Sequence, residues 1–224
     1  MKTLITIVVI LFTSLSAFSQ LRGSGKTVTK TYDYQNFAKV NFNDLDGKLD
    51  IEVGKPFSIS ITIDDNLLYL LSVVEQSADK QLTVSLKSNQ NNSKYIENTK
   101  IKVKITMPYL TEVSNNGNSS LIVSNINSKT FKSENPVNGS TILSGVVENF
   151  EVICRENGNL YADKLIAKNA KVTCRGNGNA KVNVTSSIIA TAAANGNIIN
   201  IGNAPFTKES KIFGNGSLNG KKTS

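Results

Sequence analysis

The chain has 224 residues and a formal net charge of +8, and it contains no histidine and no tryptophan. Lack of histidine removes the commonest general base and transition-metal ligand, and lack of tryptophan removes the strongest aromatic platform for sugars. The lysines are scattered rather than gathered into a basic stripe with interleaved aromatics, so we expect no nucleic-acid partner.

Residues 1–19 have the pattern of an export signal. Lys2 gives a positive start, and the mostly apolar run 4–15 is too short to anchor in a bilayer. Ala17 and Ser19 suit cleavage before Gln20. We therefore expect a mature chain without a transmembrane anchor, exported to the periplasm, the cell surface or the medium.

Residues 20–108 predict an N-terminal layer of antiparallel strands, because short stretches alternate apolar and polar side chains. These stretches are 40–45, 49–53, 57–63, 82–86 and 101–105. Apolar residues at helical spacing in 66–71 predict one or two helical turns, with Asp64 or Asp65 as the N-cap. The polar run 89–94 predicts a loop or a hairpin tip.

Residues 109–224 are organised by a repeat. Six glycines recur roughly every twenty residues, each preceded by Asn and followed by Asn or Ser. The pairs are Asn116 and Gly117, Asn138 and Gly139, Asn157 and Gly158, Asn177 and Gly178, Asn195 and Gly196, and Asn215 and Gly216. The β-prone residues between them predict a parallel β-helix, or β-solenoid, of about six turns stacked about 4.8 Å apart. The expected fold is all-β, with the antiparallel layer leading into the solenoid.

The asparagine-glycine pairs are expected to form one corner of each turn, because this pair readily adopts positive φ. Amides pointing inward would hydrogen-bond along the stack. A calcium-binding role is disfavoured because the corners carry no carboxylate in a comparable column, and no metal or cofactor site is predicted.

Interior columns are expected four residues before and four residues after each glycine. The first column is Val113, Asn135, Cys154, Cys174, Ala192 and Ile212, and the second is Leu121, Leu143, Ala162, Val182, Asn200 and Gly220. These side chains are mostly small or aliphatic, which predicts a slim core.

Cys154 and Cys174 occupy equivalent places in successive turns, where a disulfide or two buried thiols would fit. Parallel Cβ vectors favour the thiols. Arg155 and Arg175 follow them on the outer face, as candidate contacts for an anion or an acidic sugar. Solvated arginines without a ligand are the alternative, because two like charges about 5 Å apart repel by only about 0.8 kcal/mol in water.

Catalytic residues are not predicted. Glycosidases need a pair of carboxyl groups flanking one bond, whereas the acidic residues of the repeats fall in different columns. These residues are Glu134, Glu148, Glu151, Glu156, Asp163 and Glu209.

Three features resemble a known family: the stretch 63–68, the junction Met107-Pro108-Tyr109-Leu110 and the recurring Asn-Gly-Asn. They resemble the head GIN domain family, also described as an auto-transporter adhesin and known mainly from Bacteroidetes. The resemblance covers about residues 34–216. It implies a β-helical envelope or surface protein with an adhesive role, and it brings no catalytic residues.

The expected function is that of a non-catalytic adhesion or envelope-binding module. Its partner would be a polysaccharide or another surface component, bound by a polar solenoid face rich in Asn, Ser, Thr and Lys. A carbohydrate-active β-helix enzyme and a purely structural envelope protein are the alternatives. The sequence leaves the oligomeric state open.

Overall fold

The computed structural model describes residues 21–87, 96–97 and 99–220, so the predicted export signal and the predicted loop 89–94 lie outside the described residues. Within the described residues the chain forms strands and one short 3-10 helix, η1 (Asp65–Leu70). The strands are β1 (Leu21–Arg22), β2 (Thr27–Tyr32), β3 (Lys39–Asn43), β4 (Gly47–Val53), β5 (Ser58–Asp64), β6 (Leu71–Gln76), β7 (Gln81–Leu86), β8 (Ile96–Glu97), β9 (Ile101–Met107), β10 (Glu112–Asn116), β11 (Ser120–Asn135), β12 (Ser140–Cys154), β13 (Asn159–Gly176), β14 (Asn179–Ala194), β15 (Asn197–Asn200), β16 (Lys211–Gly214) and β17 (Ser217–Asn219).

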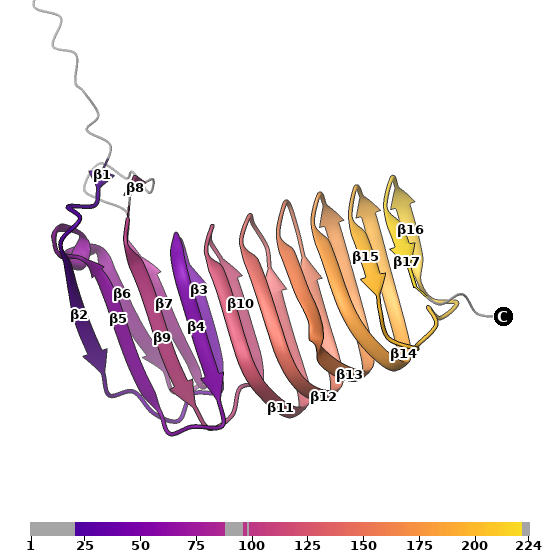
Figure 1. Cartoon of the computed structure of the whole chain (residues 1–224), viewed down its shortest axis with the longest axis horizontal. Coiled ribbons are helices and arrows are strands. Elements are labelled where there is room, and N and C mark those ends of the chain that lie inside the picture. The colour runs from indigo at the N-terminus through magenta and orange to yellow at the C-terminus, as the bar shows by residue number, and fades with distance from the viewer. Residues whose placement is uncertain (1–20, 88–95, 98, 221–224) are drawn as a thin grey trace, which may run out of the picture.

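Apart from β1 and β8, which pair with each other, the strands form two walls that stack along one long axis (Figure 1). The first wall runs in the order β2, β5, β9, β4, the first halves of β11 to β14, β15 and β17. The second wall runs β6, β7, β3, β10, the second halves of β11 to β14, and β16. Each long strand bends from the first wall into the second without a break, and an asparagine-glycine corner then returns the chain to the first wall.

Pairing is antiparallel only at the N-terminal end of the stack, between β2 and β5, β5 and β9, and β6 and β7. Every other pair in the walls is parallel, including β3 with β10 and β4 with β11. The all-β prediction of an antiparallel layer leading into a β-solenoid is confirmed. The solenoid has about five turns rather than about six, since six corners enclose five intervals.

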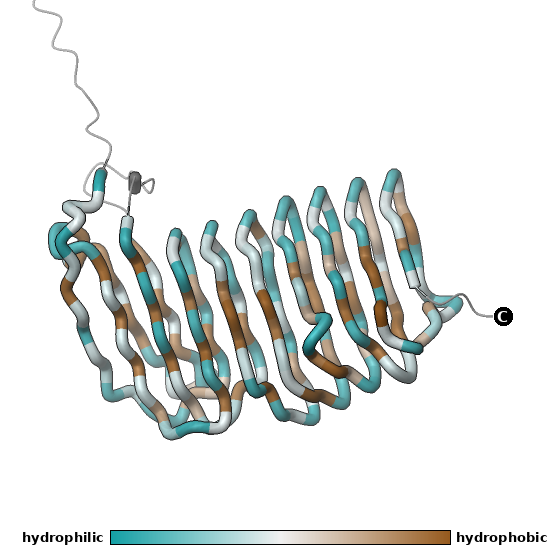
Figure 2. Tube along the Cα trace, in the orientation of Figure 1, coloured by the Kyte–Doolittle hydropathy of each residue, from teal (hydrophilic) through white to brown (hydrophobic). Residues whose placement is uncertain are grey.

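Alternating burial along the strands places the core between the walls. In β9 the apolar side chains are buried and the polar side chains between them are more exposed. Figure 2 shows the same alternation of hydrophobic and hydrophilic residues along the later turns. The interior includes Phe42, Ile51, Val103 and Val152, all with no measurable exposure. Burial of this continuous apolar column stabilises the stack, at about 25 cal/mol for each Å² removed from water.

The predicted helical turns at 66–71 appear as η1, whose Leu67 and Leu70 are buried. Asp64 precedes η1, but its side chain makes no cap hydrogen bond. Its buried carboxylate instead accepts from the backbone N–H of Gly25 at 2.8 Å and of Lys100 at 2.6 Å, and so joins two distant segments.

The corner glycines do not adopt positive φ, so that part of the prediction is wrong. Glycine is required because the backbone of the preceding turn is too close. A Cβ on Gly158 would lie 2.4 Å from the carbonyl oxygen of Asn135, and one on Gly196 would lie 2.6 Å from that of Cys174. In the last four corners a left-handed residue lies two positions before the glycine, as at Gly176 with φ of 87°.

The first corner is offset by two residues from the other five. Ser120 pairs with Ser140, and the amide of Asn138 bonds to Asn118 rather than to Asn116. The first members of the two predicted columns are therefore out of register with the rest. Val113 pairs with Ser133 and Leu121 with Thr141, so both lie two positions out of the columns assigned to them.

The far ends of both predicted columns are not interior. Ile212 continues the column of Cys174 and Ala192 but is 53% exposed, and Gly220 is exposed. No further described turn covers them.

Cys154 and Cys174 are register partners in β12 and β13, and both thiols are free and buried. A hydrogen bond with Cys174, reinforced by burial, raises the pKa of Cys154 well above its ordinary value. The thiol therefore stays protonated at pH values where an exposed cysteine begins to ionise, and protonated thiols are poor nucleophiles.

We expect the folded protein to show no reaction with Ellman's reagent at pH 8, and unfolding in guanidinium to release two reactive thiols. Titration with and without denaturant checks this. A disulfide in the mature protein would give no thiols in either state.

Candidate functional site

Arg155 and Arg175 follow the paired cysteines and lie exposed on neighbouring turns. Neither has an ion-pair partner among the described residues, and neither lines a cavity described below. Their proposed contact with an anion or an acidic sugar stays a prediction.

The corner asparagines form a continuous hydrogen-bonded ladder on the outside of the molecule. Each side-chain NH₂ donates to the side-chain oxygen one turn back, at distances such as 2.8 Å from Asn157 to Asn138 and 3.0 Å from Asn177 to Asn157. The ladder runs Asn118, Asn138, Asn157, Asn177, Asn195 and Asn215. Since these amides satisfy one another, the ladder ties the turns together rather than offering a row of free groups.

The inward asparagines are different residues. Asn135 is 1% exposed, and it donates to the carbonyl of Asn159 at 2.6 Å and accepts from the Thr141 hydroxyl at 2.6 Å. Asn115 is fully buried and donates to the carbonyl of Ser119 at 3.0 Å. Both satisfy corner carbonyls from inside the coil, where water cannot.

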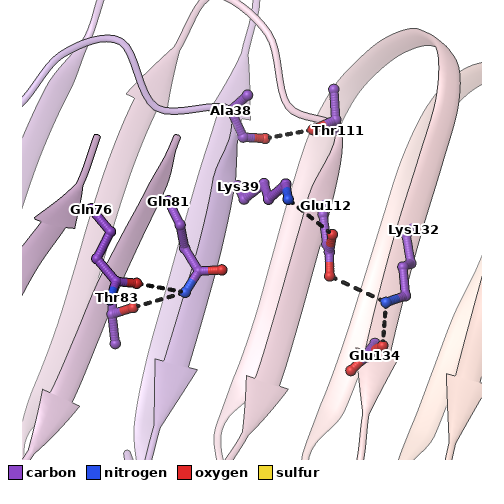
Figure 3. A network of polar contacts seen from close by, with 9 residues as sticks. All are labelled: Ala38, Lys39, Gln76, Gln81, Thr83, Thr111, Glu112, Lys132 and Glu134. Atoms are coloured by element: carbon purple, nitrogen blue, oxygen red, sulfur yellow. Dashed lines mark hydrogen bonds and ion pairs between the residues drawn. The ribbon is translucent and has the colours of Figure 1, made fainter. Parts of the chain in front are cut away.

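A column of alternating charge runs along the outside of the second wall. Its register order is Lys39, Glu112, Lys132, Glu151 and Lys171. Figure 3 shows the start of this column, where Glu112 lies between Lys39 at 4.0 Å and Lys132 at 3.3 Å. The alternating charges oppose mispairing of the strands by one turn, because a strand paired one turn too far along would place like charges side by side.

Lys132 contacts two carboxylates, that of Glu112 in the column and that of Glu134 two residues further along its own strand (Figure 3). The hydrogen bond with Glu134 and the nearby negative charges raise the pKa of Lys132. The sequence did not reveal this pairing, because Glu112 belongs to the short strand β10, before the regular repeats. Neither carboxylate lines a cavity described below.

A groove of about 360 Å³ lies on the second wall beside the charge column. One side is a column of hydroxyl and amide groups, and the other continues the charge column. The lining residues are Thr130, Asn149, Phe150, Glu151, Asn169, Ala170, Lys171, Ser187 and Ile189. We call this the second-wall groove.

The polar groups of the second-wall groove are positioned by the strands beneath them. Asn149, Asn169 and Ser187 are register partners in β12, β13 and β14. The amide of Asn169 donates to the side-chain oxygen of Asn149 at 3.2 Å. Glu151 and Lys171 are also register partners, yet they form no ion pair with each other. Both charged groups therefore remain available to a ligand.

Two further cavities flank the solenoid edges. One, of about 510 Å³, lies where the long strands bend and includes Val146, Ile166, Lys129 and Lys168. The other, of about 290 Å³, lies at the first corners and includes Asp44 and Asp46 beside corner asparagines. Among the residues that the structure describes, no three His, Cys, Asp or Glu side chains are grouped to hold a metal ion.

Apart from Glu151, which was named among the scattered carboxylates of the repeats, the groove residues were not singled out from the sequence. Thr130, Asn149, Asn169 and Ser187 recur about one turn apart, and this period is the signal that could have found them. It is weaker than the asparagine-glycine signal because the residue type changes between turns.

Several solved structures have the same fold. A protein of Bacteroides fragilis described as a putative adhesin matches with a TM-score of 0.65 and 20% identity, covering 89% of this chain and 98% of that one. A putative adhesin of Parabacteroides merdae matches with a TM-score of 0.53 and 21% identity, with coverage of 89% and 98%. At these identities the likeness shows the fold.

A third structure is described as a putative lipid binding protein of Parabacteroides distasonis, with a TM-score of 0.58, 19% identity and coverage of 89% and 98%. Among proteins with curated descriptions, none matches the chain. Across the described residues, no helix has the length and apolar character to cross a membrane.

A family model matches residues 36–204, most of the chain and nearly all of the two-walled stack. Its description is "Putative auto-transporter adhesin, head GIN domain". The resemblance noted in the sequence is thereby confirmed, and the chain belongs to this head GIN domain family of adhesins.

Proposed function

We propose that the protein is a non-catalytic adhesion module, exported to the periplasm or the cell surface, that binds a polysaccharide in the second-wall groove. The observation that carries this proposal is the groove itself. It runs along the stack for several turns, with hydroxyl and amide groups on one side and a separated Glu151 and Lys171 on the other.

The chemistry of the lining suits a chain of sugar rings. Sugar hydroxyls both donate and accept, and the groove offers both functions through amides, hydroxyls, one carboxylate and one ammonium group. Phe150 and Ala170 also line the groove, but both are buried, so Ile189 supplies the apolar surface for ring C–H groups. An apolar surface beside a few convergent polar groups is the usual form of a ligand site.

Catalysis is disfavoured by the number of carboxyl groups. Hydrolysis of a glycosidic bond ordinarily uses two, held about 5 to 10 Å apart across the bond. The groove lining includes one, Glu151. Glu112 and Glu134 do lie near each other, but both hold Lys132 and neither lines the groove.

A glycan array probed with residues 20–224 tests the proposal, followed by titration of the best ligand. Asn169→Leu and Lys171→Ala should each weaken binding about tenfold or more, the equivalent of losing about 1.4 kcal/mol of polar contact. Asn179→Leu is the matched control, since Asn179 is an exposed amide that donates to the side chain of Asn159 one turn back at 3.0 Å and lies outside the groove.

The outcomes separate the three candidate functions. If the wild type binds none of the envelope and host glycans, the purely structural role is favoured. If both groove variants bind the glycan as tightly as the wild type does, the binding site lies on another surface. Shortened glycan products would establish an enzyme.

A further inference from the structure

An apolar stripe crosses the outer surface of the first wall. Ile122, Ile142 and Tyr161 are register partners in β11, β12 and β13, so their side chains lie next to one another on three successive turns. They are 43%, 38% and 42% exposed. Single exposed apolar residues need no explanation, but three in one column on a flat wall form a contiguous patch, which is typical of an interface.

Opposite charges mark the two ends of this stripe. Asp50 of β4 is the register partner of Ile122, and Lys181 of β14 is the register partner of Tyr161. Lys104 of β9 lies beyond Asp50, and Ile199 of β15 lies beyond Lys181. The column therefore reads Lys104, Asp50, Ile122, Ile142, Tyr161, Lys181, Ile199. Neither Asp50 nor Lys181 has an ion-pair partner in the part of the chain that the structure describes.

Small polar side chains border one side of the stripe on the same outer surface. Ser120, Ser140 and Asn159 form the neighbouring column. Because these side chains are short, they leave the stripe accessible to another flat surface.

The five central members of the column are self-complementary under two-fold rotation. If a second copy lies face to face with its solenoid axis reversed, Ile142 meets Ile142, Ile122 meets Tyr161, and Asp50 meets Lys181 twice. Each Lys104 then meets Ile199, so no like charges face each other in the column. If the two axes ran in the same direction, Asp50 would meet Asp50 and Lys181 would meet Lys181. Like charges in an interface disfavour that second arrangement.

We propose that the first wall is a self-association surface, which pairs two copies of this chain face to face with their axes antiparallel. The occupant is a second copy because the charges at the stripe ends complement each other only through this symmetry, and two-fold contacts are the commonest way in which chains self-associate. The second walls of such a pair face outward on opposite sides. Both second-wall grooves then stay open on opposite sides, so the pair can bridge two polymers or two surfaces.

Sedimentation equilibrium across the micromolar range tests this proposal on residues 20–224. The wild type should form a dimer, and Ile142→Glu should weaken it at least tenfold. Val146→Glu is the matched control, because Val146 lies in the same strand, is 55% exposed and is outside the stripe. Circular dichroism melting confirms that both variants stay folded.

A charge exchange tests the antiparallel arrangement. Asp50→Lys and Lys181→Asp should each weaken the dimer, and the double variant should regain it, since the exchanged residues again face opposite charges. A wild type that stays monomeric would overturn the proposal, as would a dimer lost in Val146→Glu but not in Ile142→Glu. A double variant no better than the single ones would refute the antiparallel arrangement.

Discussion

Replacing Gly158 by alanine should lower the free energy of unfolding by about 1 to 3 kcal/mol, the usual cost of forcing an extra methyl group into packed structure. The methyl carbon would lie 2.4 Å from the carbonyl oxygen of Asn135 and 2.8 Å from that of Val137. Both atoms belong to the backbone of the preceding turn, which cannot move without separating the stack. Guanidinium unfolding, followed by circular dichroism, measures the loss.

Gly54 is the control that separates crowding from backbone conformation. It has φ of 89°, and nothing lies within 4 Å of the position of its Cβ. Asparagine tolerates a left-handed backbone better than alanine does, so Gly54→Asn should be milder than Gly54→Ala. At Gly158 asparagine should be no milder than alanine, because crowding does not depend on φ. An alanine variant of Gly158 with unchanged stability would refute close approach as the reason for glycine.

Asn135→Leu should also be strongly destabilising. The substitution leaves the carbonyl of Asn159 and the hydroxyl of Thr141 without their buried partner, which stands 2.6 Å from each. A buried polar group left unpaired costs about 1 to 3 kcal/mol, so the two together predict a loss of about 2 to 6 kcal/mol. Denaturant unfolding measures it.

A double-mutant cycle with Thr141→Val checks the cause. Removing both side chains of the Asn135–Thr141 pair leaves fewer unpaired groups than Asn135→Leu alone, so the double variant should lose less than the sum of the single losses. Asn177→Leu, in the exposed ladder, should change stability by about 0.5 kcal/mol or less. Equal losses at Asn135 and Asn177 would contradict the distinction between inward and outward asparagines.

Local patterns in the sequence predicted the architecture. Alternation of apolar and polar residues in 101–105 predicts a strand with one buried side, and β9 is such a strand. The asparagine-glycine period predicts stacked turns because each turn cannot bury its apolar side alone. These signals depend on neighbouring residues or on a fixed spacing, so they can be read without coordinates.

The candidate site was harder to predict, because it depends on register between strands. Lys39 and Glu112 are far apart in the sequence, yet β3 and β10 pair them in the same column as Lys132. The offset of the first corner shifts Val113 and Leu121 out of the columns predicted for them. An error of two residues keeps the side chain on the same side of the strand but gives it different neighbours, so the core could be predicted while the surface columns could not.

By itself, the sequence determined that this protein is an all-β solenoid with a repeated corner and a family resemblance to adhesins. Only the tertiary structure decided why the corner needs glycine, which asparagines point inward, and where the second-wall groove and the apolar stripe lie. The physical reason is that periodicity specifies which residues recur, whereas contacts between turns depend on how adjacent strands align. That alignment is set by packing of the whole stack.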